Sequence, residues 1–267
     1  MSNFIVTTAR KFTDDAENLA VETAKKLNLK FVRRENFSLD ALKKIHDAEN
    51  ILIAKNNSLV VSTENGELFF HPNTAHLRIK NLRRGLNDRL IDATKLSEGM
   101  KILDCTLGLG SDAIVESFVV GESGKVVALE KSPALAEVVR FGLKNFSADN
   151  EKILSAMRRI EVVTTDYLDY LKAAEKNSFD VVYFDPMFRR PVEKSSGINP
   201  LRPVADNRPV SSEAVREACR VAKNFVVLKE NSRSEEFNRL LFKIAEGGKY
   251  SSISFGVIDC KNLEWKK

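Results

Sequence analysis

The sequence predicts an α/β protein in which helices cover both faces of a parallel sheet, together with a small N-terminal α/β subdomain. Three observations predict this fold class. From residue 100 onward, short apolar runs that suit buried strands alternate with segments of helical periodicity. The first run leads into a glycine turn, and several runs end on a carboxylate. Continuously apolar strands must be buried on both sides, which is typical of a parallel sheet.

The glycine turn is the most informative local feature. Residues 101–105 form a mostly apolar run, Gly108 and Gly110 favour a tight turn, and an apolar helical period begins at Ala113. A strand, turn and helix in this order point backbone N–H groups and a helix N-terminus at a ligand. Gly108-x-Gly110-x-x-Ala113 fits a dinucleotide fingerprint, whereas Asp104-x-x-x-Gly108-x-Gly110 fits the first motif of an S-adenosylmethionine-binding methyltransferase. The glycines alone leave both interpretations open.

Length, charge and cysteine content limit the number of domains, the kinds of partner and the cellular compartment that we expect. The 267 residues, 43% of them hydrophobic, allow one large domain or one domain with a smaller companion. The net charge of +5 is compatible with a polyanionic partner, although solubility alone would explain it. Three scattered cysteines without a Cys-x-x-Cys pair favour a reducing cytosol over a disulfide scaffold or a zinc site. We see neither a signal peptide nor a membrane-length apolar run, and expect a cytoplasmic protein without a membrane partner.

We expect residues 1–72 to form the small N-terminal α/β subdomain. Its expected elements are a strand at 4–7, a helix opening at 13, a strand at 31–32, a helix over 38–45 and strands at 51–54, 59–61 and 68–70. A basic helical connector is expected over 73–98, with Gly85 as a break and Arg83 and Arg84 among its charges. These charges either simply face water or border a nucleic-acid groove.

Residues 99–267 are expected to form the ligand-binding domain. After the glycine turn, strands are predicted at 125–130, 160–164, 179–184, 225–228 and 253–258. Between them, helices are predicted from Pro133, around 153–157, after Asp166, from Ser211 or Ser212, and around 237–241. Ser132-Pro133 is a typical helix start, with serine as the cap and proline at the first helical position.

Polar residues at strand ends are the candidate ligand contacts, because ligands in such sheets bind beyond the carboxyl ends of the strands. Glu130 can accept both hydroxyl protons of a ribose, or it is a solvated strand end. Asp166 can accept a hydrogen bond from an adenine amino group, cap the following helix, or do both. Asp104 can meet the ammonium of a bound methionine moiety. Ser111 and Asp112 can contact the same moiety, although the helix dipole equally explains a carboxylate there.

The four residues Asp185-Pro186-Met187-Phe188, directly after a predicted buried strand, favour amine methylation. The lone pair of an exocyclic amine on a nucleobase is delocalised into the ring, so the nitrogen is a poor nucleophile. The Asp185 carboxylate and the Pro186 carbonyl can accept its two protons, and Phe188 can stack on the base. Positioning and electrostatics would then carry the catalysis. The alternative is a strand-end turn with a packing phenylalanine.

Together these motifs resemble the bacterial small-subunit ribosomal RNA guanine-N2 methyltransferase family. The resemblance rests on Asp-x-Thr-x-Gly-Leu-Gly-x-Asp-Ala at 104–113, Leu-Glu at 129–130, Asp-Pro-Met-Phe at 185–188, Val-Val-x-Lys at 226–229 and Gly-Lys-Tyr at 248–250. It implies a class I, Rossmann-like methyltransferase fold. It also implies S-adenosylmethionine contacts at Ser111-Asp112, Glu130-Lys131, Asp166-Tyr167 and Asp185.

The chain departs from this family at two places. Ser111 stands where family members carry an arginine, and the stretch after Phe188 differs. That stretch is rich in proline and basic residues, and we expect Arg189, Arg190 and Lys194 to contact RNA phosphates or to close over the base.

The leading hypothesis is therefore an S-adenosylmethionine-dependent methyltransferase acting on an exocyclic amine, guanine N2 in ribosomal RNA or the small ribosomal subunit. An NAD-dependent oxidoreductase would account for the glycines and Glu130 but not for the motif at 185–188. A non-catalytic RNA-binding module that kept the fold is the third hypothesis. No metal is expected, because His46, His71 and His76 do not form a ligand-like set.

Overall fold

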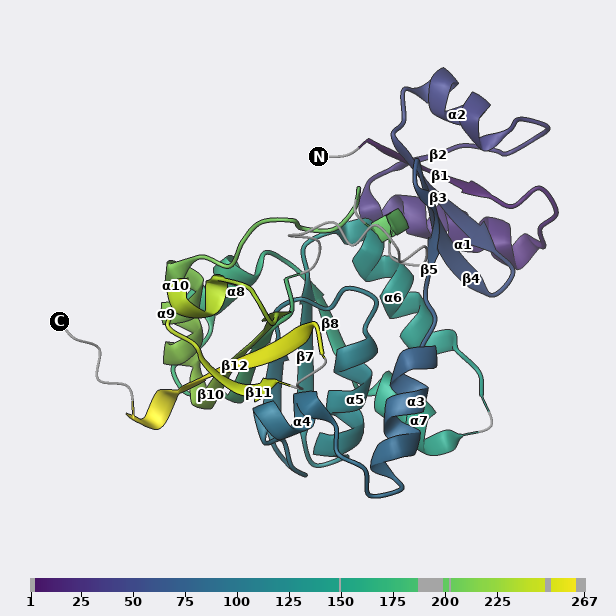
Figure 1. Ribbon diagram of the computed structural model, residues 1–267. Coiled ribbons are helices and arrows are strands. Elements are labelled where there is room, and N and C mark those ends of the chain that lie inside the picture. The colour runs from purple at the N-terminus through teal and green to yellow at the C-terminus, as the bar shows by residue number, and fades with distance from the viewer. Residues whose placement is uncertain (1–2, 149, 187–198, 202, 248–250, 263–267) are drawn as a thin grey trace. The chain divides into compact units, whose positions relative to one another are not determined.

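The computed structural model describes residues 3–148, 150–186, 199–201, 203–247 and 251–262 (Figure 1). Its contacts divide the chain into two compact units. The first unit comprises the residues up to His71, residues 132–146 and the described part of 190–206. The second unit comprises the other described residues, and it contains every candidate ligand contact that the structure describes.

The first unit is built on a five-stranded sheet in the order β2-β1-β3-β4-β5. Its strands are β1 (Phe4–Thr8), β2 (Lys30–Phe31), β3 (Asn50–Lys55), β4 (Ser58–Thr63) and β5 (Gly66–Phe69). Its helices are α1 (Asp14–Leu27), α2 (Leu39–His46), α6 (Pro133–Asn145) and the single 3₁₀ turn η1 (Asn199–Leu201). The side chains of Thr13, Ser38 and Ser132 cap α1, α2 and α6. The predicted elements of residues 1–72 are confirmed.

The second unit is built on a seven-stranded sheet in the order β11-β12-β10-β9-β6-β7-β8. Its strands are β6 (Lys101–Asp104), β7 (Lys125–Glu130), β8 (Glu161–Thr164), β9 (Phe179–Phe184), β10 (Ala222–Asn231), β11 (Lys243–Gly247) and β12 (Ile253–Asp259). Strands β6 to β10 are parallel, whereas β12 and β11 add an antiparallel edge. The predicted parallel sheet is confirmed, but β11 was not predicted, because Lys-Ile-Ala-Glu-Gly has little apolar character.

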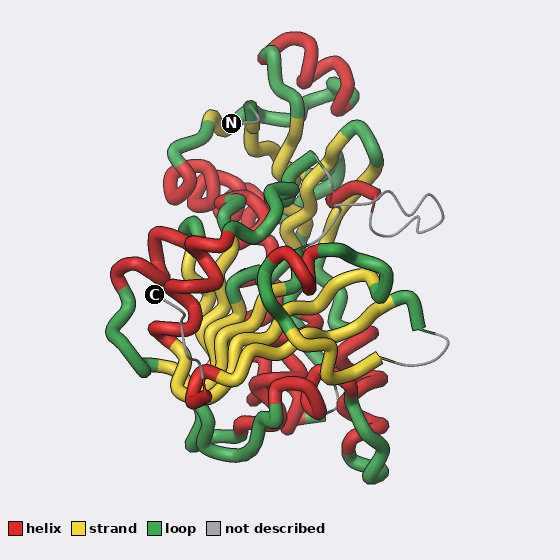
Figure 2. Tube along the Cα trace, turned by 60° about the vertical axis from the view of Figure 1, so that its left-hand side comes forward, coloured by secondary structure: helices red, strands yellow, loops and turns green. Residues whose placement is uncertain are grey.

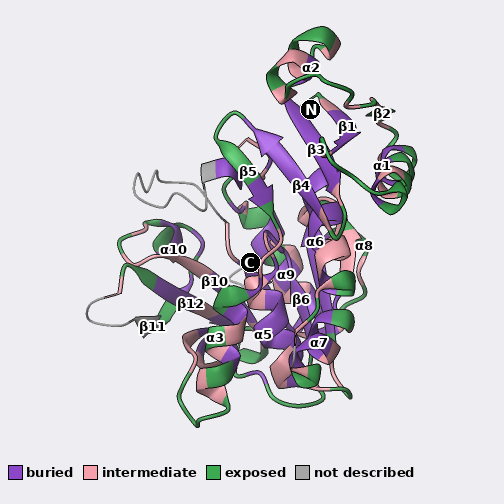
Figure 3. Cartoon of the chain, turned by 90° about the vertical axis from the view of Figure 1, so that its right-hand side faces the viewer, coloured by how far each residue is buried: buried purple, intermediate pink, exposed green. Residues whose placement is uncertain are grey.

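Helices lie on both faces of this sheet (Figure 2). They are α3 (Asn73–Leu82), α4 (Arg89–Thr94), α5 (Ser111–Val120), α7 (Glu151–Arg158), α8 (Tyr167–Ala173), α9 (Ser212–Val221), α10 (Glu236–Arg239) and the 3₁₀ turn η2 (Cys260–Asn262). Helices α3, α5 and α7 pack together, and α8 packs on α9 over the core that contains Leu103, Val182 and Val226. The residues of this core are buried, and Figure 3 colours buried residues purple. No described helix is long and apolar enough to cross a membrane.

The connector over 73–98 is two helices, because Gly85 adopts a left-handed backbone with φ +78°. The leucine spacing predicts a buried face of Leu77, Leu82, Leu86, Leu90 and Ile91. This prediction is wrong for Leu77 and Leu86, which are 60% and 54% exposed. Ala75 and Ile79, four residues apart, are the buried residues of α3. Leu77 lies two positions from each, about 200° around the helix, and therefore faces the opposite side.

Candidate active site

Three charged side chains meet at the carboxyl end of the central strands. Asp185 directly follows β9, Lys229 lies near the end of β10, and Asp112 is the second residue of α5. The Nζ of Lys229 lies 2.7 Å from Oδ2 of Asp185 and 2.9 Å from Oδ2 of Asp112. The hydroxyl of Tyr183 also donates to Oδ2 of Asp112, at 2.8 Å. One ammonium thus bridges the two carboxylates, both of which are largely buried.

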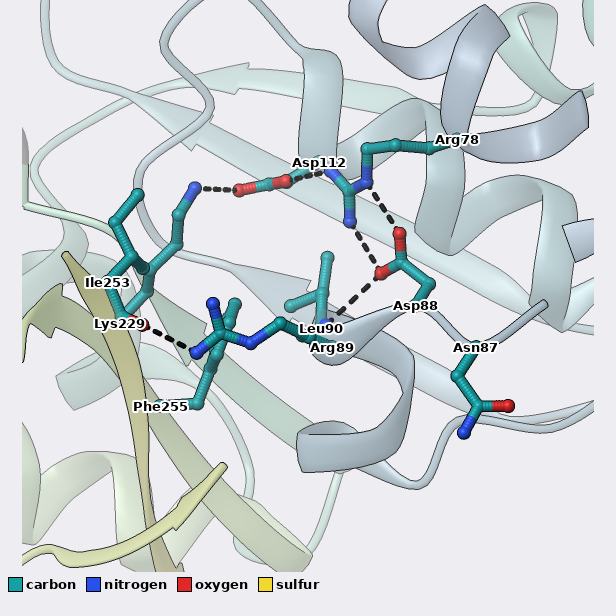
Figure 4. A pocket seen from close by; sticks show the side chains of 9 residues that line it. All are labelled: Arg78, Asn87, Asp88, Arg89, Leu90, Asp112, Lys229, Ile253 and Phe255. Carbon is teal, nitrogen blue, oxygen red and sulfur yellow. Dashed lines mark hydrogen bonds and ion pairs between the residues drawn. The ribbon is translucent and has the colours of Figure 1, made fainter. Parts of the chain in front are cut away.

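A second cation extends this cluster toward α4. The guanidinium of Arg78, in α3, donates through Nε and Nη2 to the two carboxylate oxygens of Asp88, at 2.7 and 2.8 Å. Its Nη1 donates to Asp112 (Figure 4). Asp88 in turn caps α4, accepting from the amide of Leu90 at 3.1 Å. A continuous charge network thus links five side chains in the order Asp88, Arg78, Asp112, Lys229 and Asp185. Of the two interpretations of the connector's charges, the one in which they simply face water does not hold for Arg78.

The two carboxylates that share Lys229 have different ionisation. Burial opposes the charge of Asp112, but Lys229 and Arg78 outweigh it and hold its pKa well below the ordinary range. Asp185 has only a share in Lys229, so burial raises its pKa, and the nearby charge of Asp112 adds to the rise. Asp112 is therefore the fixed anion of the network, and Asp185 is the carboxylate that more readily exchanges a proton.

Thr106 joins the end of β6 to the end of β9. Its amide donates to Oδ1 of Asp104 at 2.9 Å, and its hydroxyl accepts from the amide of Asp185 at 2.7 Å. Asp104 is only 1% exposed, and burial raises its pKa to about 8 even though the Thr106 amide bond acts in the opposite direction. Asp104 thus holds a proton at neutral pH unless a bound cation lowers its pKa.

The glycine turn has the conformation that a close backbone approach requires. Gly108 and Gly110 have φ of +52° and +79°, which side chains with a Cβ rarely adopt. Gly110 is the N-cap of α5, and the amide of Gly108 donates to the buried Glu130 at 3.3 Å. A helix N-terminus and a carboxylate at the end of the adjacent strand form a donor and acceptor set that suits the amino-acid and ribose parts of S-adenosylmethionine.

Asp166 and its neighbours lie at the end of β8. Oδ1 of Asp166 accepts from the amide of Leu168 at 2.9 Å and caps α8, as one of the two interpretations held. Its Oδ2 lies 2.5 Å from Arg208 and 3.3 Å from Lys131. Burial acts against the charge, but the hydrogen bonds from Arg208 and Leu168 lower the pKa of Asp166. Tyr167 packs edge-on against Phe184, with ring centroids 5.6 Å apart.

Several candidate residues cannot be placed in this site. Met187, Phe188, Arg189, Arg190 and Lys194 lie outside the described residues, and Pro186 is half-buried. Arg83 and Arg84 are exposed just after α3. Among the described residues there is no group of three His, Cys, Asp or Glu side chains that could hold a metal ion.

Sequence reasoning missed three members of the site. Arg78 and Asp88 are far along the chain from their partner Asp112, and Tyr183 reads simply as part of an apolar strand. Lys229, by contrast, is the lysine of the Val-Val-x-Lys segment at 226–229, on which the family resemblance partly rests.

A family model described as "Putative SAM-dependent methyltransferase" matches residues 23–246. The chain belongs to this family. The Bacillus subtilis protein YpiP is 38% identical to this methyltransferase over 254 residues, which cover 95% of this chain and 98% of YpiP. The crystal structure of a SAM-dependent methyltransferase from Neisseria gonorrhoeae has the same fold, with a TM-score of 0.63 and 16% identity over 97% of each chain.

Several more distant relatives carry the name ribosomal RNA small subunit methyltransferase J. The one from Legionella pneumophila (strain Lens) is 29% identical over 144 residues, 53% of this chain and 56% of its own length. The one from Dechloromonas aromatica is 30% identical over 162 residues, 58% of this chain and 63% of its own length. The methyltransferase described here thus matches somewhat more than half the length of these two relatives.

Proposed function

We propose that this methyltransferase transfers a methyl group to an exocyclic amine of RNA, with N2 of a guanine in small-subunit ribosomal RNA as the acceptor. The observation that carries the proposal is the position of Asp185, a largely buried carboxylate with a raised pKa at the end of β9. It lies between the glycine turn after β6 and the cation of β10. A proton acceptor at that point is what a poorly nucleophilic amine needs.

The chain's own groups act on the amine. Oδ2 of Asp185 is bonded to Lys229, which leaves Oδ1 to accept one amine proton, while the carbonyl of Pro186 accepts the other. Two acceptors orient the nitrogen and localise its lone pair. Lys229 is a positioning residue, since its ammonium holds Oδ2 of the Asp185 carboxylate. Asp185 is also placed to take the proton that the nitrogen loses.

The cofactor contacts remain as the sequence suggested. We assign the amino-acid end of S-adenosylmethionine to Asp104, Ser111, Asp112 and the turn at Gly108 and Gly110. We assign the ribose and adenine to residues at or just after the ends of β7 and β8, namely Glu130, Lys131, Asp166 and Tyr167. When bound, S-adenosylmethionine supplies an electrophilic methyl group on a sulfonium. The carboxylates at this edge suit that positive charge, because Asp112 stays ionised and a bound cation would lower the raised pKa of Asp104.

The relatives named ribosomal RNA small subunit methyltransferase J support RNA as the substrate. The Asp-Pro-Met-Phe motif and its resemblance to guanine-N2 enzymes support the amine. The NAD-dependent alternative gives no role to this motif, and the family match argues against it. Side-by-side calorimetry with S-adenosylhomocysteine and NAD tests that choice directly, since only S-adenosylhomocysteine is expected to bind.

The substrate is tested by incubating the purified protein with methyl-labelled S-adenosylmethionine and either free small-subunit ribosomal RNA or small ribosomal subunits. The RNA is then digested to nucleosides and analysed by mass spectrometry. We expect label in N2-methylguanosine. Label in another nucleoside would overturn the guanine assignment. RNA binding without transfer, unchanged by Asp185→Ala, would instead identify a non-catalytic RNA-binding module.

A further inference from the structure

Two of the three cysteines meet at the edge of the seven-stranded sheet that lies opposite the candidate active site. Cys219 is in the last turn of α9, which leads directly into β10, and Cys260 opens η2 directly after β12. Phe225, near the start of β10, pairs with Asp259 at the end of β12, so Cys260 lies beside the start of β10. Both cysteines pack against the same hydrophobic core. The topology thus brings together two thiols that are far apart along the chain.

The two thiols are in direct contact. The Cys219 thiol donates a hydrogen bond to the sulfur of Cys260, and the amide of Val226 donates to the same sulfur. The Cys260 thiol in turn donates to the carbonyl oxygen of Ile258 at 3.9 Å. Both cysteines are free in the structure. Thiols in such contact can form a disulfide bond of about 2.05 Å after a small side-chain rotation.

The two sulfurs differ in acidity. The hydrogen bond from Cys219 stabilises the thiolate of Cys260 and holds its pKa below the ordinary value, although burial and the charge of Asp259 act in the opposite direction. The same hydrogen bond, together with burial, raises the pKa of Cys219. Cys260 is therefore the better nucleophile of the two. Each side chain is only half-buried, so a small oxidant can reach it.

Cys105 provides a contrast within the same chain. It directly follows β6 at the carboxyl end of the parallel strands, which is the edge opposite the pair. It is only 3% exposed, and burial, with Asp104 and Glu116 nearby, raises its pKa well above the ordinary value. A buried thiol of this kind is inert, so oxidation should be confined to the other two cysteines.

We propose that Cys219 and Cys260 form a modification site, a dithiol that a two-electron oxidant such as hydrogen peroxide converts reversibly into a disulfide. The thiolate of Cys260 attacks one oxygen of the peroxide, the O–O bond breaks, and the leaving hydroxide takes up the thiol proton to become water. The Cys219 sulfur then attacks the sulfenic acid on Cys260, the S–S bond forms, and a second water leaves. One peroxide is reduced and two thiols are oxidised.

The disulfide joins α9 to the closing strand β12. It closes a loop of about 40 residues, which restricts the unfolded chain far more than the folded one, where the two thiols already touch. Oxidation should therefore stabilise the protein. The inference does not depend on which substrate receives the methyl group, so it stands or falls separately from the proposed function.

Mass spectrometry of the full-length protein tests the proposal. We expect hydrogen peroxide to lower the intact mass by two hydrogens. After denaturation, N-ethylmaleimide should then label one of the three cysteines instead of all three, and dithiothreitol should restore the other two. A proteolytic map of the oxidised protein should contain two peptides joined through Cys219 and Cys260.

Thermal unfolding measures the effect on stability. The oxidised wild type should have a Tm higher by about 5 °C or more than the reduced protein, because a loop of this length is closed. Cys219→Ser and Cys260→Ser should each lose the cross-link and the rise in Tm. Cys105→Ala is the matched control and should keep both.

Three outcomes would overturn the proposal. Three thiols that still react with N-ethylmaleimide after excess peroxide would show that the pair is not oxidised. A cross-link that involves Cys105, or that joins two chains, would show that Cys219 and Cys260 are not partners. Oxidation of Cys260 to a sulfinic acid without a bond to Cys219 would show that the two sulfurs do not meet in solution.

Discussion

At the scale of single residues, chemistry depends on how one ammonium is shared between two carboxylates. Lys229 contacts Asp112 and Asp185 at 2.9 and 2.7 Å, but Asp112 also has Arg78. The carboxylate with two cations stays ionised, whereas the other has a raised pKa. The network thus places a stronger base, Asp185, next to Asp112, which stays charged. Functional sites commonly shift the pKa values of two neighbouring acids apart in this way.

Replacing Asp185 with asparagine should abolish most of the methyl transfer. Asp185→Asn keeps the shape but removes a proton acceptor, and a loss of about 100-fold or more in kcat is expected. Labelled methyl transfer to RNA measures it. Asp169→Asn removes an exposed acid of α8 and is the matched control. A kcat within about twofold of wild type for Asp185→Asn would remove Asp185 from the chemistry.

Lys229→Met should move the acidic limb of the pH–rate profile to higher pH. Asp185 must be ionised to accept a proton, and Lys229 lowers its already raised pKa. Loss of the ammonium raises that pKa further, so less Asp185 is ionised at neutral pH and activity recovers at alkaline pH. Lys223→Met, in the same strand but paired with Asp180, controls for the substitution. An unmoved acidic limb in a folded Lys229→Met protein would contradict this assignment.

At the scale of elements, α5 connects the glycine turn to the interior. Its first turn carries Asp112, and one turn later Glu116 is completely buried. Neither carboxylate oxygen of Glu116 has a hydrogen-bond partner among the described residues. Burial, with Asp104 and Asp112 nearby, raises the pKa of Glu116 well above its ordinary value. The helix therefore carries a neutral acid in a position where a charge would be costly.

Glu116→Met should stabilise the protein by about 1–3 kcal/mol, because it removes a buried polar group without hydrogen bonds. The gain should grow above about pH 4.3, since the wild-type side chain ionises there only when unfolded and so destabilises the fold as pH rises. Thermal unfolding at pH 5 and pH 8 measures both effects. Glu116→Gln loses the titration but stays polar, and should gain less. If the Tm difference between variant and wild type were the same at pH 5 and pH 8, Glu116 would not be a neutral acid in the folded protein.

At the scale of the whole molecule, net charge and exposed arginines are the features that would attract the proposed RNA substrate. The chain carries a net charge of +5, and Arg83 and Arg84 are exposed after α3, the helix that holds Arg78 in the charge network. Exposed cations of this kind bind phosphates and release counterions, so affinity falls with salt.

Replacing Arg83 and Arg84 with alanine should make RNA binding weaker and less dependent on salt. If each arginine contacts one phosphate of single-stranded RNA, the slope of log affinity against log salt should fall in magnitude by about 1.4. Fluorescence anisotropy with a labelled RNA at several salt concentrations measures it. Lys43→Ala with Lys44→Ala removes the same charge from α2 and should leave the slope unchanged. An unaltered slope in the arginine variant would exclude these phosphate contacts.

The sequence by itself determined the order of strands and helices apart from β11, the glycine turn and the strand-end residues Asp104, Glu130, Asp166 and Asp185. These depend on local causes, since apolar periodicity, caps and positive φ are properties of neighbouring residues. The same reasoning placed too much of α3 in the interior, as Leu77 shows, because periodicity does not say which face is covered.

Only the tertiary structure decided which charged groups meet. Lys229 and Asp112 are 117 residues apart and Arg78 and Asp112 are 34 apart, so no local pattern links them. The register of β9, β10 and β12 brings Lys229 beside both Asp185 and Phe255. Side-chain pairing across strands and the resulting pKa values depend on this register and on burial, and both arise only when the sheet has formed.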